Sequence, residues 1–394
     1  MIALKTHKWL MTGTALLLVV LFPAERCLGQ DLTVGTSAAK ATPISLAGFT
    51  GVTESVLKQD LAIVGFEVVS ADRAKYTVSG GVKGGQLEGT LTETVNKQVH
   101  FSNAYTDASE RARAHRLADD IVKATLNLPP IGRTRIAFKV DTGKNSEIYV
   151  ADFDGHNAVK LTEDGSIVAA PTWAPGGRNL LYTSYRANNP DIYMHRADGN
   201  RTPIARFSGL NTSANVSPDG TRFAAILSKS GSPDVWVLGI DGSNPVQLTK
   251  TREDESSPCW APDGKTICFS SRETGRAMLY AVSASGGAMQ KVNAGGIQNA
   301  TEPDWSPDGS LIAFTQAVSG GFQICIVQAN GGRGGEVKRL CPGEDPSWSP
   351  NSRTLIFTKR VNGKRVLSLL DVKTGQVKDA AQISGSCSQP SWAR

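Results

Sequence analysis

One short motif recurs through the second two-thirds of the chain at a nearly constant spacing. Its fullest copy is Trp305-Ser306-Pro307-Asp308-Gly309, and an apolar run follows it at residues 311–314. The copies are anchored at Trp173, Val216, Trp260, Trp305, Trp348 and Trp392. Successive anchors lie 43 to 45 residues apart. A period of this length is typical of a repeat architecture, so it constrains the fold more than composition does.

Each repeat carries the signals of four short antiparallel strands. The strand that holds the anchor enters a Pro-Asp-Gly turn, and an apolar strand such as residues 355–358 follows. A polar loop leads to a third strand, such as residues 234–237, and a further Gly-containing turn starts a fourth, such as residues 246–249. Asp-Gly turns supply the positive φ that tight hairpins need. Four such strands in each repeat form the blade of a β-propeller.

Six anchors predict six blades, although only the first strand of the last blade follows the fifth repeat. The other three strands of that blade match residues 135–140, 147–151 and 159–162. We therefore expect residues 131–394 to form a ring that joins its two ends within one blade. Such closure leaves no exposed sheet edge. The Trp and Pro-Asp-Gly residues are then expected to serve the fold rather than the function.

Residues 43–130 have the pattern of a small α/β domain. Strands are expected at residues 43–49, 66–69, 76–78, 87–92 and 98–101. Helical spacing of apolar residues covers residues 53–63, and a second helix should follow the capping-box sequence at residues 107–110. Pro129-Pro130 then marks the domain boundary. The predicted fold is an all-β six-bladed β-propeller preceded by a small α/β domain.

The first 42 residues are expected to lie outside both domains. Lys5 and Lys8, an apolar core at residues 10–22 and Cys27-Leu28-Gly29 match the three parts of a secretory signal peptide over residues 1–29. The apolar core is shorter than the roughly 20 residues that span a bilayer, which disfavours a membrane anchor. Residues 30–42 are small and polar, typical of a flexible amino-terminal arm.

Five cysteines follow the signal segment, and secretion would expose them to an oxidising compartment. Cys259 and Cys268 flank one tight turn, and Cys325 and Cys341 flank another, so each pair can face across neighbouring strands. Cross-strand disulfides have narrow geometric limits. Two disulfides and five buried thiols, with Cys387 as the fifth, both remain open at this point.

Composition and motifs give no indication of catalysis or of nucleic-acid binding. The formal net charge is +6, and no Lys/Arg run has the density of a nucleic-acid patch. Gly-x-Ser-x-Gly, His-Glu-x-x-His and Walker motifs do not occur. The histidines beyond the signal segment, at positions 100, 115, 156 and 195, have no converging partners. We expect no enzyme activity, no cofactor and no metal.

A binding surface is the remaining functional feature. The loops that enter the first strand of each blade share one face of a propeller and differ more from blade to blade than the strands do. They cover residues 165–170, 209–214, 254–257, 298–302 and 343–345. Variable loops on a rigid scaffold are common binding sites.

The order of these features resembles the TolB family. The resemblance rests on His115-Arg116-Leu117-Ala118-Asp119-Asp120 at the end of the small domain and on Arg133-Thr134-Arg135-Ile136-Ala137-Phe138 at the start of the ring. It implies a periplasmic, non-enzymatic component of the Tol-Pal system, involved in outer-membrane integrity and cell division. Its propeller face would bind the peptidoglycan-associated lipoprotein Pal. Its amino-terminal arm would communicate with TolA, so that it would contact membranes only through partners.

Aligning the loops before the anchors with those of the TolB family implies a set of Pal-contact positions. They are Leu210, Asn211, Ser213, Ser256, Ser257, Thr301 and Glu302. Leu210 stands where the family has a polar His, and Ser256-Ser257 replaces a Thr-Glu pair. The alternative function is enzymatic, because similar propellers accompany peptidases and occur in carbohydrate lyases. A peptidase would require a further α/β-hydrolase domain, and a lyase would require His or acidic ligands in its channel.

Overall fold

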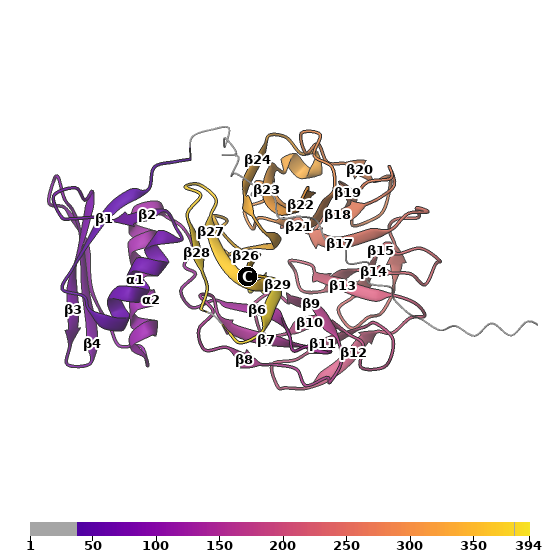
Figure 1. Ribbon diagram of the computed structural model, residues 1–394, viewed down its shortest axis with the longest axis horizontal. Coiled ribbons are helices and arrows are strands. Elements are labelled where there is room, and N and C mark those ends of the chain that lie inside the picture. Colours follow the sequence, from indigo (N-terminus) through magenta and orange to yellow (C-terminus); the bar gives the residue numbers. More distant parts are fainter. Residues whose placement is uncertain (1–37, 382) are drawn as a thin grey trace, which may run out of the picture. The chain divides into compact units, whose positions relative to one another are not determined.

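The computed structural model describes residues 38–381 and 383–394. The predicted signal peptide and most of the predicted arm lie outside these residues. Within them, an α/β domain precedes a six-bladed β-propeller, as predicted (Figure 1). No helix in this part of the chain combines the length and the apolar character needed to cross a membrane.

The α/β domain is a five-stranded sheet with two helices on one face (Figure 1). The strand order is β2-β1-β3-β4-β5, in which β1 runs parallel to both β2 and β3 and the other pairs are antiparallel. The elements are β1 Thr42–Ala47, α1 Gly51–Ala62, β2 Phe66–Val68, β3 Tyr76–Lys83, β4 Gln86–Glu93, β5 Val99–Tyr105 and α2 Glu110–Leu126. Every strand and helix predicted here is present, with ends shifted by a few residues.

The start of α2 differs from the predicted capping box. Ser109 is the N-cap, and its hydroxyl accepts the N–H of Ala112 at 3.1 Å. Glu110 does not turn back to cap its own helix, because its carboxylate accepts the N–H and the hydroxyl of Thr53 on α1 at 3.1 and 2.8 Å. This acidic side chain therefore joins the first turns of the two helices. The left-handed Asn127 ends α2.

The propeller consists of six four-stranded antiparallel sheets around a ring, with the first strand of each innermost (Figure 1). Five blades are continuous in sequence. Their strands are β9 Val168–Trp173, β10 Leu180–Ser184, β11 Asp191–His195 and β12 Arg201–Ala205; β13 Asn211–Val216, β14 Arg222–Leu227, β15 Asp234–Gly239 and β16 Val246–Gln247; β17 Glu255–Trp260, β18 Thr266–Ser271, β19 Met278–Ser283 and β20 Gln290–Lys291; β21 Ala300–Trp305, β22 Leu311–Val318, β23 Gly321–Gln328 and β24 Val337–Pro342; β25 Glu344–Trp348, β26 Thr354–Val361, β27 Lys364–Asp371 and β28 Val377–Asp379.

The sixth blade closes the ring as predicted. Its strands are β29 Ser386–Trp392, β6 Arg135–Asp141, β7 Ser146–Asp152 and β8 Val159–Lys160. β29 pairs with β6 in a register that sets Trp392 opposite Ile136, so the two ends of the ring share one hydrogen-bonded sheet. This closure ties the last strand to residues more than 240 positions earlier.

The anchor tryptophans hold neighbouring blades together. The indole N–H of Trp348 donates to the Asp304 carbonyl at 3.1 Å, and that of Trp260 donates to the Asn215 carbonyl at 3.0 Å. Both acceptors belong to the first strand of the preceding blade. Burial of a large aromatic ring together with a satisfied N–H explains why the sequence repeats this residue. The expectation that the anchors serve packing is therefore confirmed for these two.

The cysteine positions agree only in part with the sequence interpretation. Cys259 on β17 lies opposite Cys268 on β18, as expected. Cys341 on β24 instead lies opposite Ile324, because a bulge between Ile324 and Cys325 shifts the register. The suggested opposition of Cys325 and Cys341 is therefore wrong. All five cysteines of the described residues are free thiols.

Candidate functional site

The six first strands enclose a channel of about 420 Å³ along the axis of the propeller. Trp and Pro side chains of the repeated motif line part of it, together with residues from all six first strands. Among the described residues, no group of three or more His, Cys, Asp or Glu side chains is arranged to hold a metal ion. The chemistry of the site therefore has to come from hydrogen bonds and from a few charges.

Each first strand places one non-glycine residue in left-handed conformation against the channel. These residues are Ala170, Ser213, Ser257, Glu302, Asp345 and Gln389, with φ between 48° and 56°. Every one of them lies at a break in register between the first and second strands of its blade. Left-handed backbone costs a residue with a Cβ of order 1 kcal/mol or more. Strain repeated at one structural position marks this ring of residues as a candidate functional feature.

Side chains connect consecutive members around half of this ring. The N–H of Asp345 donates to Glu302 Oε2 at 3.0 Å, and the N–H of Gln389 donates to Asp345 Oδ2 at 3.1 Å. The N–H of Ala170 then donates to Gln389 Oε1 at 2.9 Å. Each bond crosses from one blade to the next. The series ends at Ala170, whose methyl group has no acceptor to offer Ser213.

Two acidic groups lie side by side in this half of the channel. Glu302 accepts the Thr315 hydroxyl at 2.6 Å, and Asp345 accepts the Thr358 hydroxyl at 3.2 Å. Burial, and then the nearby Glu302 carboxylate, raise the pKa of Asp345 to about 8. Asp345 is consequently protonated near neutral pH.

The Arg394 guanidinium closes off another part of the channel. It forms an ion pair with Asp304 and donates to the carbonyls of Trp348 and Trp305, each at 3.1 Å. The strands β21 and β25 are thereby joined to the last residue of the chain. This arrangement neutralises Asp304 inside the channel.

The structure brings together only part of the predicted partner-binding set. Ser213, Ser257 and Glu302 line the channel as members of the left-handed ring. Ser256 and Thr301 precede two of these residues and are partly buried. Their predicted contact with a partner remains a prediction.

Leu210 and Asn211 play a local role at the point where the chain enters β13. The Leu210 side chain packs against a buried cluster that includes Trp260. The Asn211 side chain is fully buried, and its amide donates to the carbonyls of Pro190, Phe207 and Gly209 at 2.8 to 3.2 Å. Asn211 can therefore influence a partner only through the shape of the chain at this point.

Ala170 and Asp345 lie in two of the predicted binding loops but were not singled out as contact positions, and Gln389 lies outside all of those loops. A signal for them was present, because each left-handed residue lies three positions before an anchor of the repeat. The loop alignment considered that position in three blades only. Extending the period to all six blades would have located the complete ring.

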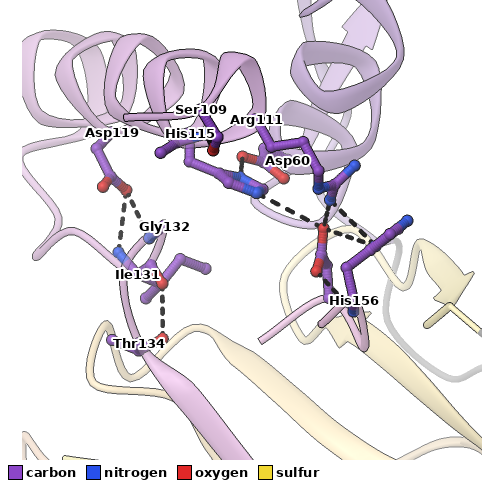
Figure 2. A network of polar contacts seen from close by, with 11 residues as sticks. Asp60, Ser109, Arg111, His115, Asp119, Ile131, Gly132, Thr134 and His156 are labelled. Carbon is purple, nitrogen blue, oxygen red and sulfur yellow. Dashed lines mark hydrogen bonds and ion pairs between the residues drawn. The ribbon is translucent and has the colours of Figure 1, made fainter. Parts of the chain in front are cut away.

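A second polar cluster joins the α/β domain to the propeller (Figure 2). Arg111 on α2 forms an ion pair with Asp154 in the turn between β7 and β8. His115 is also on α2, and its Nδ1 is hydrogen-bonded to Asp60 Oδ2 on α1 at 2.6 Å. Its Nε2 lies 3.7 Å from Asp154 Oδ2. His156 Nδ1 lies 3.3 Å from the same Asp154 oxygen. One buried carboxylate of the propeller is thus surrounded by three basic side chains.

The burial of this cluster perturbs its titration. Burial alone would lower the pKa of His115, but the hydrogen bond and charge of Asp60, together with the charge of Asp154, raise it. Burial raises the pKa of Asp60, although His115 opposes that shift. Burial also raises the pKa of Asp119 to about 6, against the N–H groups of Gly132 and Ile131 that donate to its Oδ1 at 3.0 Å. The cluster therefore binds protons more readily than its separated groups would.

Comparison with known proteins gives a consistent picture. The family model of the TolB beta propeller domain matches residues 130–394. The Tol-Pal system protein TolB of Anaeromyxobacter dehalogenans (strain 2CP-C) is 37% identical over 159 residues, which cover 39% of this chain and 35% of that protein. The protein of the same name from Bordetella pertussis is 29% identical over 215 residues, covering 54% and 47%. The chain thus spans about a third to a half of these relatives.

Solved structures share the fold at low sequence identity. The crystal structure of TolB from Acinetobacter baumannii matches with a TM-score of 0.81 and 22% identity, over 91% of this chain and 98% of that one. A putative TolB from Agrobacterium tumefaciens matches with a TM-score of 0.51 and 22% identity, over 64% and 90%. The first match extends over both the α/β domain and the propeller, since it covers more of this chain than the propeller contains.

Proposed function

The chain belongs to the TolB beta-propeller family, and we propose that it is a periplasmic, non-catalytic binding protein of a Tol-Pal system. In this proposal the mouth of the channel captures a Pal-like peptidoglycan-associated lipoprotein. The outcome for the cell would be support of outer-membrane integrity and cell division. The names of the curated relatives support the Tol-Pal assignment. The signal-peptide pattern at residues 1–29 supports export.

One observation carries the proposed binding role. Three positions that the family resemblance implies for Pal contact, Ser213, Ser257 and Glu302, come from three different blades and line one cavity. They share a strained left-handed backbone, which is common where a site is preorganised. Ser213 and Ser257 are partly exposed to the channel, so a partner can reach them.

Calorimetric titration with the purified soluble domain of the Pal-like lipoprotein from the same organism tests this proposal. Replacing Ser213 by Arg adds a long cation to the channel lining, and replacing Ser256 by Arg adds one next to Ser257, which also lines the channel. We expect each change to weaken binding by about tenfold or more. Ser285→Arg is the matched control, because Ser285 is exposed on the hairpin between β19 and β20. The proposal fails if the wild-type protein gives no binding, or if all three variants bind equally.

We further propose that the amino-terminal region contacts a TolA-like protein. Residues 30–42 would supply the contact, as the family resemblance implies. Removing residues 30–38 leaves β1 intact, since that strand begins at Thr42. Loss of TolA-like binding in this deletion, with lipoprotein binding preserved, is the expected result, whereas unchanged binding of both partners would refute the role of the arm.

A further inference from the structure

The amides of the left-handed ring fall into two groups of three. Those of Ala170, Asp345 and Gln389 donate to side chains of neighbouring blades. Those of Ser213, Ser257 and Glu302 meet no such acceptor among residues 38–381 and 383–394. All three lie at positions skipped by the strand pairing of their own blades. Because the six bulges share one backbone geometry, these three N–H groups should point toward the equivalent place in the channel.

Side-chain length explains why one group is open. The residue in the preceding blade has to reach the next amide, as Glu302, Asp345 and Gln389 do with a planar carboxyl or carboxamide oxygen. Ala170, which precedes Ser213, has no acceptor atom. The serines at 213 and 257 carry an oxygen only one bond beyond Cβ, compared with two or three bonds in Asp, Glu and Gln. The open group therefore forms an arc of donors on β13, β17 and β21.

We propose that this arc binds the planar side-chain oxygen of a Glu or Gln residue that a partner protein inserts into the channel. The inference rests on the proposed function, since the captured lipoprotein would supply that residue. The amides of Ala170, Asp345 and Gln389 show which acceptor suits such a position, because each of them already donates to a carboxyl or carboxamide oxygen. The hydroxyls of Ser213 and Ser257 offer further donors beside the amides.

Charge in the channel bears on which of the two side chains is preferred. A carboxylate bound at the arc would face repulsion from Glu302, whereas a carboxamide would not. Asp345 adds little repulsion at neutral pH, since it then carries a proton. The two forms share the same hydrogen-bond acceptor, so separate probes can distinguish them.

Amide NMR spectra of the full mature protein test the arc directly. The probes are N-acetylglutamate amide and N-acetylglutamine amide. We expect at least one probe to shift the amides of Ser213, Ser257 and Glu302 in a saturable manner, while those of Asp345 and Gln389 stay fixed. Ser257→Gln should cap the Glu302 amide from within and abolish its response, whereas Ser285→Gln, on the exposed hairpin between β19 and β20, should preserve it. The inference is overturned if neither probe acts selectively on the three amides, or if Ser257→Gln responds like the wild type.

Binding of the lipoprotein separates failure of this inference from failure of the proposed function. If the probes act as expected and the lipoprotein does not bind, the arc stands and the Tol-Pal role is wrong. If the lipoprotein binds, Ser257→Gln should weaken its binding about tenfold or more, while Ser285→Gln, on the exposed hairpin outside the channel, should change it little. Equal affinity of both variants would leave the binding role intact and overturn the arc.

Discussion

Replacing Asp154 by asparagine changes the contact that holds the α/β domain on the propeller. Asp154 is 1% exposed, pairs with Arg111, and has His156 and His115 nitrogens 3.3 and 3.7 Å from Oδ2. Its other oxygen accepts the His156 N–H at 3.2 Å and so helps to shape the turn between β7 and β8. Asparagine keeps that acceptor. The substitution therefore removes one buried negative charge with little change in the turn.

The expected loss follows from the burial of the pair. Removing one partner of a buried ion pair typically costs about 3–5 kcal/mol. Arg111 keeps 23% of its side chain exposed, so water can replace part of the lost interaction. We expect the substitution to reduce the stability of the contact between α2 and the β7–β8 turn by about 2–3 kcal/mol. The loss concerns α2 and the β7–β8 turn, so the α/β domain should loosen before the propeller does.

The effect should depend on pH through His115. Its pKa is raised in the folded protein, so its stabilising contribution is complete below the unfolded pKa of about 6.5 and is lost as pH rises through the folded value. Asp154 is one of the two carboxylates that raise this pKa. The difference in stability between wild type and Asp154→Asn should therefore be larger at pH 6 than above the pH at which His115 loses its proton in the folded wild type.

Hydrogen–deuterium exchange measured by peptide can localise this loss. Faster exchange in α1 and α2, with the propeller strands unchanged, is the expected pattern. Urea unfolding followed by circular dichroism gives the magnitude. Asp152→Asn is the matched control, since it makes the same change in the same hairpin and its carboxylate accepts from Asn157 at 2.6 Å. Unrelated surface substitutions scatter by on the order of 0.5 kcal/mol in the free energy of unfolding. If the free energies of unfolding of Asp154→Asn and Asp152→Asn differ by no more than this, the assigned role of the cluster is wrong.

Substitutions at three other positions test separate parts of the structure. Asp119→Asn keeps an acceptor for the N–H groups of Ile131 and Gly132 but removes a carboxyl group with a pKa of about 6. The wild type alone should therefore lose stability as pH rises from about 4 to 6. Above pH 6 the variant should have the higher urea midpoint. Asp345→Asn should likewise flatten the fall in stability that the wild type shows up to pH 8, measured in the same way. Trp348→Ala should cost about 3–5 kcal/mol in urea unfolding, since the ring is fully buried, and Trp348→Phe about 1 kcal/mol through the lost bond to Asp304.

The sequence predicted the architecture well because the signals of a propeller are local. Each Pro-Asp-Gly turn and each apolar strand can be recognised without knowledge of the rest of the chain, and the period then supplies the blade count. Closure of the ring also followed from the strand patterns near residues 135 and 392. These predictions depended on spacing and not on any particular side-chain contact.

Features that depend on contacts between distant residues could not be predicted in this way. Glu110 was expected to cap its own helix, but Thr53, 57 positions earlier, takes its carboxylate. The bulge beside Cys325 changed the register by one residue, which no strand pattern reveals. His115 had no visible partner in the sequence, because Asp60 and Asp154 approach it from another helix and from the propeller.

The ring of left-handed residues depends both on local spacing in the sequence and on contacts between distant residues. Its positions follow from the period, whereas its chemistry follows from which side chain the preceding blade supplies. Where Glu302, Asp345 and Gln389 reach the next amide, the strained backbone is partly compensated by a hydrogen bond between blades. Ser213 and Ser257 have the same strain, at a cost of order 1 kcal/mol each, without that compensation. A partner that supplies the missing acceptor would therefore find the open half of the ring already arranged for binding, since the backbone cost has been met in folding.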